Sequence, residues 1–174
     1  MLAQISRLRV SWLRQAAFFY PIRPVPRCAV LVAGFRSRAP VRVFSDGWSE
    51  DAARFEPQAI AATLAQLEAL AGVVRLSHAV IVFRREFEPR VNDAERDCLW
   101  NAFRVPVFEQ MIAADCTLLA AECEAHDGLH IESSKLAIGD RDIDRSVCAC
   151  GRATPRLIGS GRMEALRRVA TNTR

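Results

Sequence analysis

The sequence predicts an α/β fold, a small mixed sheet with helices and an antiparallel attachment, and two observations lead to it. Apolar residues make up 51% of the 174 residues, so the chain can bury a substantial core. Helical and strand-like periodicities alternate along the middle of the chain, and a β-hairpin pattern follows them. Strands joined through helices pair in parallel, whereas a hairpin adds antiparallel strands. We therefore expect one mixed sheet in a single domain.

The first 45 residues form a basic segment without any acidic residue. All 20 acidic residues of the chain follow it, whereas eight of the 24 basic residues lie within it, at Arg7, Arg9, Arg14, Arg23, Arg27, Arg36, Arg38 and Arg42. Such a segment could bind nucleic acid or acidic lipid, serve as a targeting peptide, form a partly ordered arm, or reflect a misassigned start. We expect it to precede an α/β domain at residues 46–162, which a basic tail at 163–174 follows.

The sequence predicts two strands and then a helix between residues 28 and 72. Two β-rich runs, "CAVLVAG" at 28–34 and "VRVFSD" at 41–46, predict short strands, the first of them buried. The stretch 56–72 is the clearest helix of the sequence, and Gly72 supplies a stop at its end. Its apolar residues recur at helical spacing, at Ile60, Leu64, Leu67 and Leu70.

A strand, a helix and a second strand follow. "SHAVIVFR" at 77–84 predicts a buried strand, and "PVFEQMIA" at 106–113 predicts the next one. The helix between them, at 92–105, begins with Asn92 or Asp93 as its N-cap. Its predicted apolar face consists of Ala94, Cys98 and Phe103. Cys98 lies on this face, and Cys28 lies in the predicted buried strand at 28–34. Both are therefore expected to be ordinary core cysteines.

No window of the sequence reaches the 18 apolar residues that a membrane span requires, and no signal peptide with a small-residue cleavage site is visible. We therefore expect a cytoplasmic protein. Its six cysteines should then be reduced, and cysteines that cluster in such a chain indicate a metal site rather than disulfides.

Cysteine and histidine gather in one region. The runs "CTLLAAEC" (116–123) and "LHIES" (129–133) flank a polar turn, "EAHDG", and predict a β-hairpin. Cys123 with His126 or His130 can supply one half of a tetrahedral zinc site, and the "CACG" turn, with Cys148 and Cys150, can supply the other half. Four protein ligands would close the site, which is typical of a structural zinc ion.

The register of the hairpin decides between the two histidines. If the loop is centred after His126, Cys123 lies directly opposite His130, at a separation that suits two ligands of one ion. If a two-residue type I′ turn at 127–128 closes the hairpin, Cys123 faces Glu132 instead, and His126 becomes the better ligand. Both registers are compatible with the sequence.

Three segments, in this order, resemble part of a known family. "NDAERDCLWNAFRVPVFEQ", "LLAAECEAHDGLHIES" and "CACGRATPRLIGSGR" are similar to the later part of phenylacetate-CoA ligase-like adenylate-forming enzymes, over roughly residues 75–162. Some members of that family hold a zinc ion with the cysteine and histidine of such a hairpin and the two cysteines of a C-x-C motif. The resemblance implies Cys123, His130, Cys148 and Cys150 as its ligands, with His126 as the alternative from the hairpin pattern.

The motifs that perform adenylation in that family are not recognisable in this chain. The Ser/Thr/Gly-rich loop for ATP phosphates, the nucleotide motif expected after "VFE" and the C-terminal domain with its catalytic lysine have no counterpart. We therefore expect a non-catalytic accessory or interaction module with a structural zinc ion and a protein partner. The alternatives are a partial ligase subunit that binds nucleotide or acyl-CoA, and a nucleic-acid-associated module that uses the basic segment.

Overall fold

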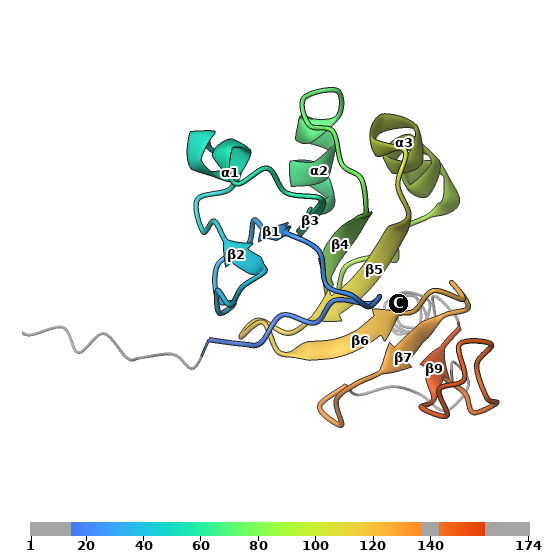
Figure 1. Cartoon of the computed structure of the whole chain (residues 1–174). Coiled ribbons are helices and arrows are strands. Elements are labelled where there is room, and N and C mark those ends of the chain that lie inside the picture. The colour runs from blue at the N-terminus through green and yellow to red at the C-terminus, as the bar shows by residue number, and fades with distance from the viewer. Residues whose placement is uncertain (1–14, 137–142, 159–174) are drawn as a thin grey trace, which may run out of the picture.

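A computed structural model describes residues 15–136 and 143–158, and in these residues nine strands form one sheet (Figure 1). The strand order is β2-β1-β3-β4-β5-β6-β7-β9-β8. The strands are β1 (Cys28–Val30), β2 (Val41–Val43), β3 (Ala59–Thr63), β4 (Ala79–Arg85), β5 (Val107–Ile112), β6 (Leu118–Glu122), β7 (Leu129–Ile131), β8 (Ile143–Asp144) and β9 (Arg156–Leu157). The helices are α1 (Glu50–Arg54), α2 (Leu64–Leu70) and α3 (Asp93–Phe103).

The sheet has a parallel half and an antiparallel half, which confirms the predicted mixed α/β architecture. Strands β2, β1, β3, β4 and β5 pair in parallel. From β5 onward each neighbouring pair is antiparallel, through β6, β7, β9 and β8. The division follows from the connections, because α2 and α3 link the parallel strands β3, β4 and β5, whereas short turns link β5 to β6 and β6 to β7.

Alternate residues of the central strands face two separate core layers. Ile60 and Val80 pack against the helices, which Figure 1 shows together above the sheet. Ala61 and Ile81 point to the opposite face, where residues around Phe18 and Phe35 cover the sheet in place of a helix. Both layers are needed because parallel strands in the middle of a sheet are buried on both faces.

The predicted helix at 56–72 is wrong in its first half. Residues 59–63 form β3, which pairs with β1 on one side and with β4 on the other, and only residues 64–70 form α2. Thr63 marks the change, because its side chain caps α2 in a capping box with Gln66. The run Ala-Ile-Ala-Ala suits either structure, and backbone hydrogen bonds to two neighbouring strands decide in favour of the strand.

Helix α3 confirms the predicted helix at 92–105 and resolves its cap. Asn92 is the N-cap, and its side chain accepts a hydrogen bond from the Glu95 N–H at 2.9 Å. The buried residues of the helix are Leu99 and Phe103, whereas Cys98 is exposed. The expectation of a core cysteine at position 98 is therefore wrong, because the helix turns this position away from the sheet. Cys28 is fully buried in β1, as expected.

The sheet begins inside the basic segment 1–45. Its residues 28–30 and 41–43 are the strands β1 and β2, and Ala16 forms a bridge with Phe35. The boundary expected at residue 46 does not separate this segment from the sheet, because the apolar runs between its arginines pair with β3 and its neighbours. Residues 1–14 and the predicted tail at 163–174 lie outside the described residues.

Among the described residues, no helix has the length and apolar character needed to cross a membrane.

Candidate metal centre

The β6–β7 hairpin differs in register from both predicted alternatives. His130 pairs with Ala121, and residues 123–128 form the connection, in which His126 and Gly128 have positive φ angles of 52° and 84°. Cys123 lies two positions beyond Ala121 and hence on the same side of the strand as this partner of His130. Diagonal neighbours of this kind remain within reach of each other, so Cys123 and His130 meet although they are not opposite.

The C-x-C segment forms a tight turn beside the hairpin. The Gly151 N–H donates to the Cys148 carbonyl at 2.8 Å, and the Cys148 N–H donates to the Arg152 carbonyl at 3.1 Å. Gly151 has a φ angle of 83°, which glycine adopts without steric strain. The turn is held close to the hairpin because β9, which follows it, pairs with β7.

These two turns bring four ligand atoms together. The thiol sulfurs of Cys123, Cys148 and Cys150 and a ring nitrogen of His130 all lie within 4.8 Å of one another. The Sγ atoms of Cys123 and Cys148 are 3.7 Å apart, and Cys150 Sγ lies 3.4 Å from His130 Nε2. A tetrahedral zinc ion would place two sulfur ligands about 3.8 Å apart and a sulfur and a nitrogen about 3.6 Å apart. The cluster could therefore hold one metal ion.

His126 is placed outside this cluster. Its ring stacks on Phe108, with 4.8 Å between the ring centroids, and its Nδ1 lies 3.2 Å from Glu122 Oε1. Of the two histidines that the sequence left open, the structure brings only His130 to the cysteines. The other three cysteines, Cys28, Cys98 and Cys116, are free thiols elsewhere in the fold.

His130 is oriented for coordination through one of its two nitrogens. Its Nδ1 lies 2.8 Å from Thr154 Oγ1 and 3.2 Å from the Thr154 carbonyl oxygen, which leaves Nε2 directed at Cys150. A proton on Nδ1 can be donated to the carbonyl, so Nε2 then carries the lone pair. Burial, and next the positive charge of Arg152, lower the pKa of His130 and favour this neutral form.

The thiols differ in how readily they ionise without a metal. Burial raises the pKa of Cys123 to about 12, which opposes the thiolate. The hydrogen bond from the Cys150 backbone N–H instead lowers the pKa of Cys148. A bound cation would stabilise both thiolates, and metal binding at this site would release protons.

Arg156, which sequence reasoning missed, fixes the hairpin turn next to the cluster. This nearly buried residue pairs with His130 across β9 and β7. Its guanidinium forms ion pairs with Asp127 and Asp144 and donates to Ser146 Oγ at 3.0 Å. An arginine that is this well buried and multiply paired orders the segments around it. Nothing in the sequence pattern distinguishes it from the many exposed arginines of this chain.

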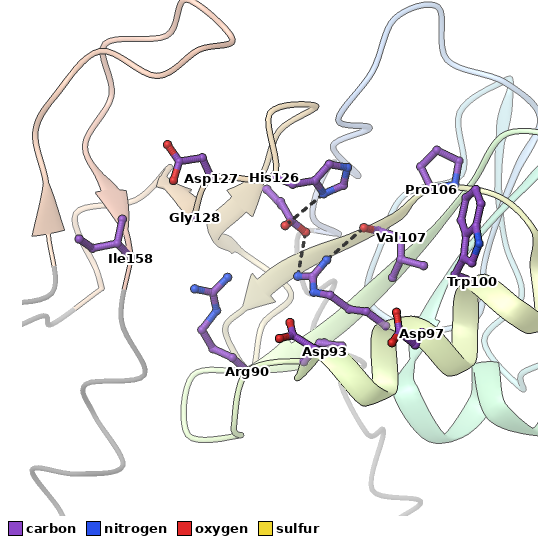
Figure 2. A pocket seen from close by; sticks show the side chains of 13 residues that line it. Arg90, Asp93, Asp97, Trp100, Pro106, Val107, His126, Asp127, Gly128 and Ile158 are labelled. Atoms are coloured by element: carbon purple, nitrogen blue, oxygen red, sulfur yellow. Dashed lines mark hydrogen bonds and ion pairs between the residues drawn. The ribbon is translucent and has the colours of Figure 1, made fainter.

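A second polar cluster, also missed, lies between α3 and the β6–β7 turn. Its buried carboxylates are Glu109 and Glu122, and both accept from Arg96, at 3.3 and 3.1 Å. Arg84 and Arg90 complete the ion pairs of Glu109. A groove with a volume of about 800 Å³ opens beside this cluster (Figure 2). Its lining comes from α3, the start of β5, the β6–β7 turn and Ile158.

Comparison with known proteins gives a likeness of fold. No family model matches the sequence, and no curated protein matches it. The solved structure of 2-hydroxyisobutyryl-CoA ligase, in an open conformation with 2-HIB-AMP and CoA, is similar to this chain with a TM-score of 0.54 and 14% identity. The likeness covers 75% of this chain but only 43% of the ligase chain. The chain therefore shares a fold with part of an acyl-CoA ligase, which confirms the sequence resemblance at that coarser level.

Proposed function

We propose that Cys123, His130, Cys148 and Cys150 bind one zinc ion and that this ion is structural. The single observation that supports it best is the spacing of the four ligand atoms, which all lie within 4.8 Å of one another. Three sulfur ligands and one imidazole are a donor set that zinc favours among the common divalent ions. Because four protein ligands fill a tetrahedral shell, no position remains for a substrate or a catalytic water.

The zinc ion would stabilise the antiparallel half of the sheet. Its ligands come from the β6–β7 hairpin and from the turn before β9, two segments that the short β7–β9 ladder and a few side-chain contacts connect. Strands of two or three residues contribute little stability by themselves. Metal binding energy would therefore act as folding energy for this part of the molecule.

The whole chain is, in this proposal, a non-catalytic cytoplasmic module with the fold of a ligase part. The likeness to less than half of an acyl-CoA ligase chain supports this, together with the adenylation motifs that the sequence lacks. An interaction with another protein would be its function. The finer relation to phenylacetate-CoA ligases belongs to the same proposal, whereas a nucleic-acid-associated module that uses the basic segment is an alternative to it.

Metal analysis of variants tests the zinc site. Protein purified without chelator or affinity metal should contain about one zinc ion per chain. Cys123→Ser and Cys148→Ser should each lose this zinc and unfold at a clearly lower temperature, because the metal stabilises the fold. Cys98→Ser is the matched control, since this thiol is exposed and outside the cluster. Full metal content and an unchanged melting curve in either ligand variant would show that the ligand set is wrong.

Residual ligand binding is the second candidate function, and one observation favours it. The similar ligase structure contains 2-HIB-AMP and CoA, and this chain shares part of that fold. Thermal shift measurements with ATP, AMP and CoA separate the two candidates. A concentration-dependent rise in melting temperature with any of them supports a partial ligase subunit. No shift with all three leaves the non-catalytic module.

A further inference from the structure

The groove beside α3 combines acidic and apolar side chains on a surface that no described segment covers. Figure 2 shows Asp93, Asp97 and Trp100 along α3, with Asp127 and Ile158 on the opposite side. Its lining residues are Arg90, Val91, Asp93, Arg96, Asp97, Trp100, Pro106, Val107, Glu122, His126, Asp127, Gly128 and Ile158. Four of them carry carboxylates and two carry guanidinium groups, so acidic groups outnumber basic ones in the lining.

The carboxylates of the groove that have no ion pair among the described residues lie on α3. Both arginines of the lining are already paired with Glu109, and Arg96 also with Glu122. Asp127 is paired with Arg156. Asp93 and Asp97 are exposed and have no ion pair among the described residues. An occupant with positive charge would therefore meet two unpaired carboxylates one helical turn apart.

The same groove exposes apolar surface. Trp100 is 47% exposed and Ile158 is 53% exposed, and both rank among the few large apolar side chains that lie open to solvent in the described residues. Figure 2 shows them on opposite sides of the lining, Trp100 on α3 and Ile158 directly after β9. Exposed apolar groups gathered beside unpaired charges are typical of a surface that binds another segment.

We propose that residues 159–174 of this chain bind in the groove. They follow directly after Ile158, which is itself part of the lining, so they are tethered at the site. Their sequence, "GSGRMEALRRVATNTR", has four arginines against one glutamate and so complements the carboxylates of α3. Its apolar residues Met163, Leu166 and Val169 recur at a spacing of three, which suits contact with Trp100 and Ile158.

The basic residues 1–14 are a less suitable occupant. They are connected to the fold through Ala16, which bridges Phe35 and packs into the core layer on the face opposite the helices. The groove lies on the helix side, since α3 forms one of its walls. The 159–174 segment therefore has the shorter path and the higher effective concentration.

Photo-crosslinking of the full chain tests this proposal. Trp100 is replaced by the photo-reactive p-benzoylphenylalanine, and crosslinked residues are mapped by mass spectrometry at low protein concentration. We expect crosslinks to residues 159–174 of the same chain. Crosslinks to residues 1–14, crosslinks to a second copy, or no crosslink in a protein with an unchanged melting curve would each overturn the proposal.

Cleavage by trypsin after Arg167 and Arg168 gives a second measurement on the native side chains. Asp97→Asn and Trp100→Ala should each accelerate this cleavage about tenfold, because bound residues are protected and central interface contacts dominate binding. The matched controls are Glu68→Gln and Val73→Ala, which change exposed residues outside the groove lining. Equal cleavage rates in all five proteins would contradict the proposal. Neither measurement depends on a bound zinc ion.

Discussion

The two nitrogens of His130 have different neighbours, and this difference defines its role at the candidate metal centre. Nδ1 contacts the hydroxyl and carbonyl of Thr154, while Nε2 lies 3.4 Å from Cys150 Sγ. Ligating histidines commonly have such a partner on the second nitrogen, which fixes the ring and its tautomer. Thr154 would therefore orient a metal-bound His130 without touching the metal, and the strength of metal binding should depend on it.

Thr154→Val tests this role at the scale of one residue. Zinc affinity should fall by about tenfold, because the ring loses one of its two orienting contacts and the carbonyl contact remains. A competition titration with a chromogenic chelator measures the affinity. Thr117→Val is a matched control at a threonine outside the cluster. An affinity equal to that of the unmodified protein would show that the Thr154 hydroxyl does not orient the ring.

At the scale of elements, the β6–β7 turn packs so closely against β9 that only glycine fits at position 128. A Cβ atom at this position would lie 2.5 Å from the Leu157 carbonyl oxygen, and the φ angle of +84° disfavours any side chain. This approach brings the hairpin against the strand that follows the C-x-C turn. The four candidate ligands therefore depend on the packing of two elements as well as on their own positions.

Gly128→Ala should lower the free energy of unfolding by roughly 2–4 kcal/mol, because backbone strain and a steric clash with backbone add together. Gly72→Ala is the matched control, since its φ angle is also positive, +76°, but no atom lies within 4 Å of its added Cβ. It should lose only about 1 kcal/mol. Urea unfolding of both variants measures the difference, and equal losses would exclude a steric contribution at Gly128.

The ion-pair cluster around Glu109 joins the two halves of the whole molecule. This fully buried carboxylate on β5 pairs with Arg84 of β4, with Arg90 and with Arg96 of α3. Arg96 continues to Glu122 of β6, which also accepts a hydrogen bond from the Glu109 N–H at 2.8 Å. The network thus spans the change from parallel to antiparallel pairing. Burial lowers the pKa of Arg84, and the charge of Glu109 opposes this effect.

Glu109→Gln should lower the free energy of unfolding of the whole molecule by about 3 kcal/mol, because it leaves buried guanidinium charge without compensation. The control Glu50→Gln removes an exposed carboxylate that pairs with Arg54 on α1, and it should change stability by less than about 1 kcal/mol. Chemical unfolding compares the two. A loss at Glu109 as small as that at Glu50 would contradict a structural role for the cluster.

The type of most elements could be predicted from local sequence patterns. Alternation and apolar runs indicated β4 and β5, and helical spacing with an N-cap indicated α3. The same reasoning failed at residues 59–63, where a run of small apolar residues is compatible with helix and strand. Pairing with β1 and β4 decides the structure there, and these partners are distant in sequence.

The sequence by itself determined which residues could bind a metal, because cysteine and histidine spacing indicates soft ligands in nearby turns. Tertiary structure decided which of them meet. The hairpin adopts a register that neither predicted turn provides, and the β7–β9 pairing, with Arg156, brings the C-x-C turn to Cys123 and His130. The physical reason is that ligand chemistry belongs to single residues, whereas register and ion pairing depend on contacts between segments that are distant along the chain.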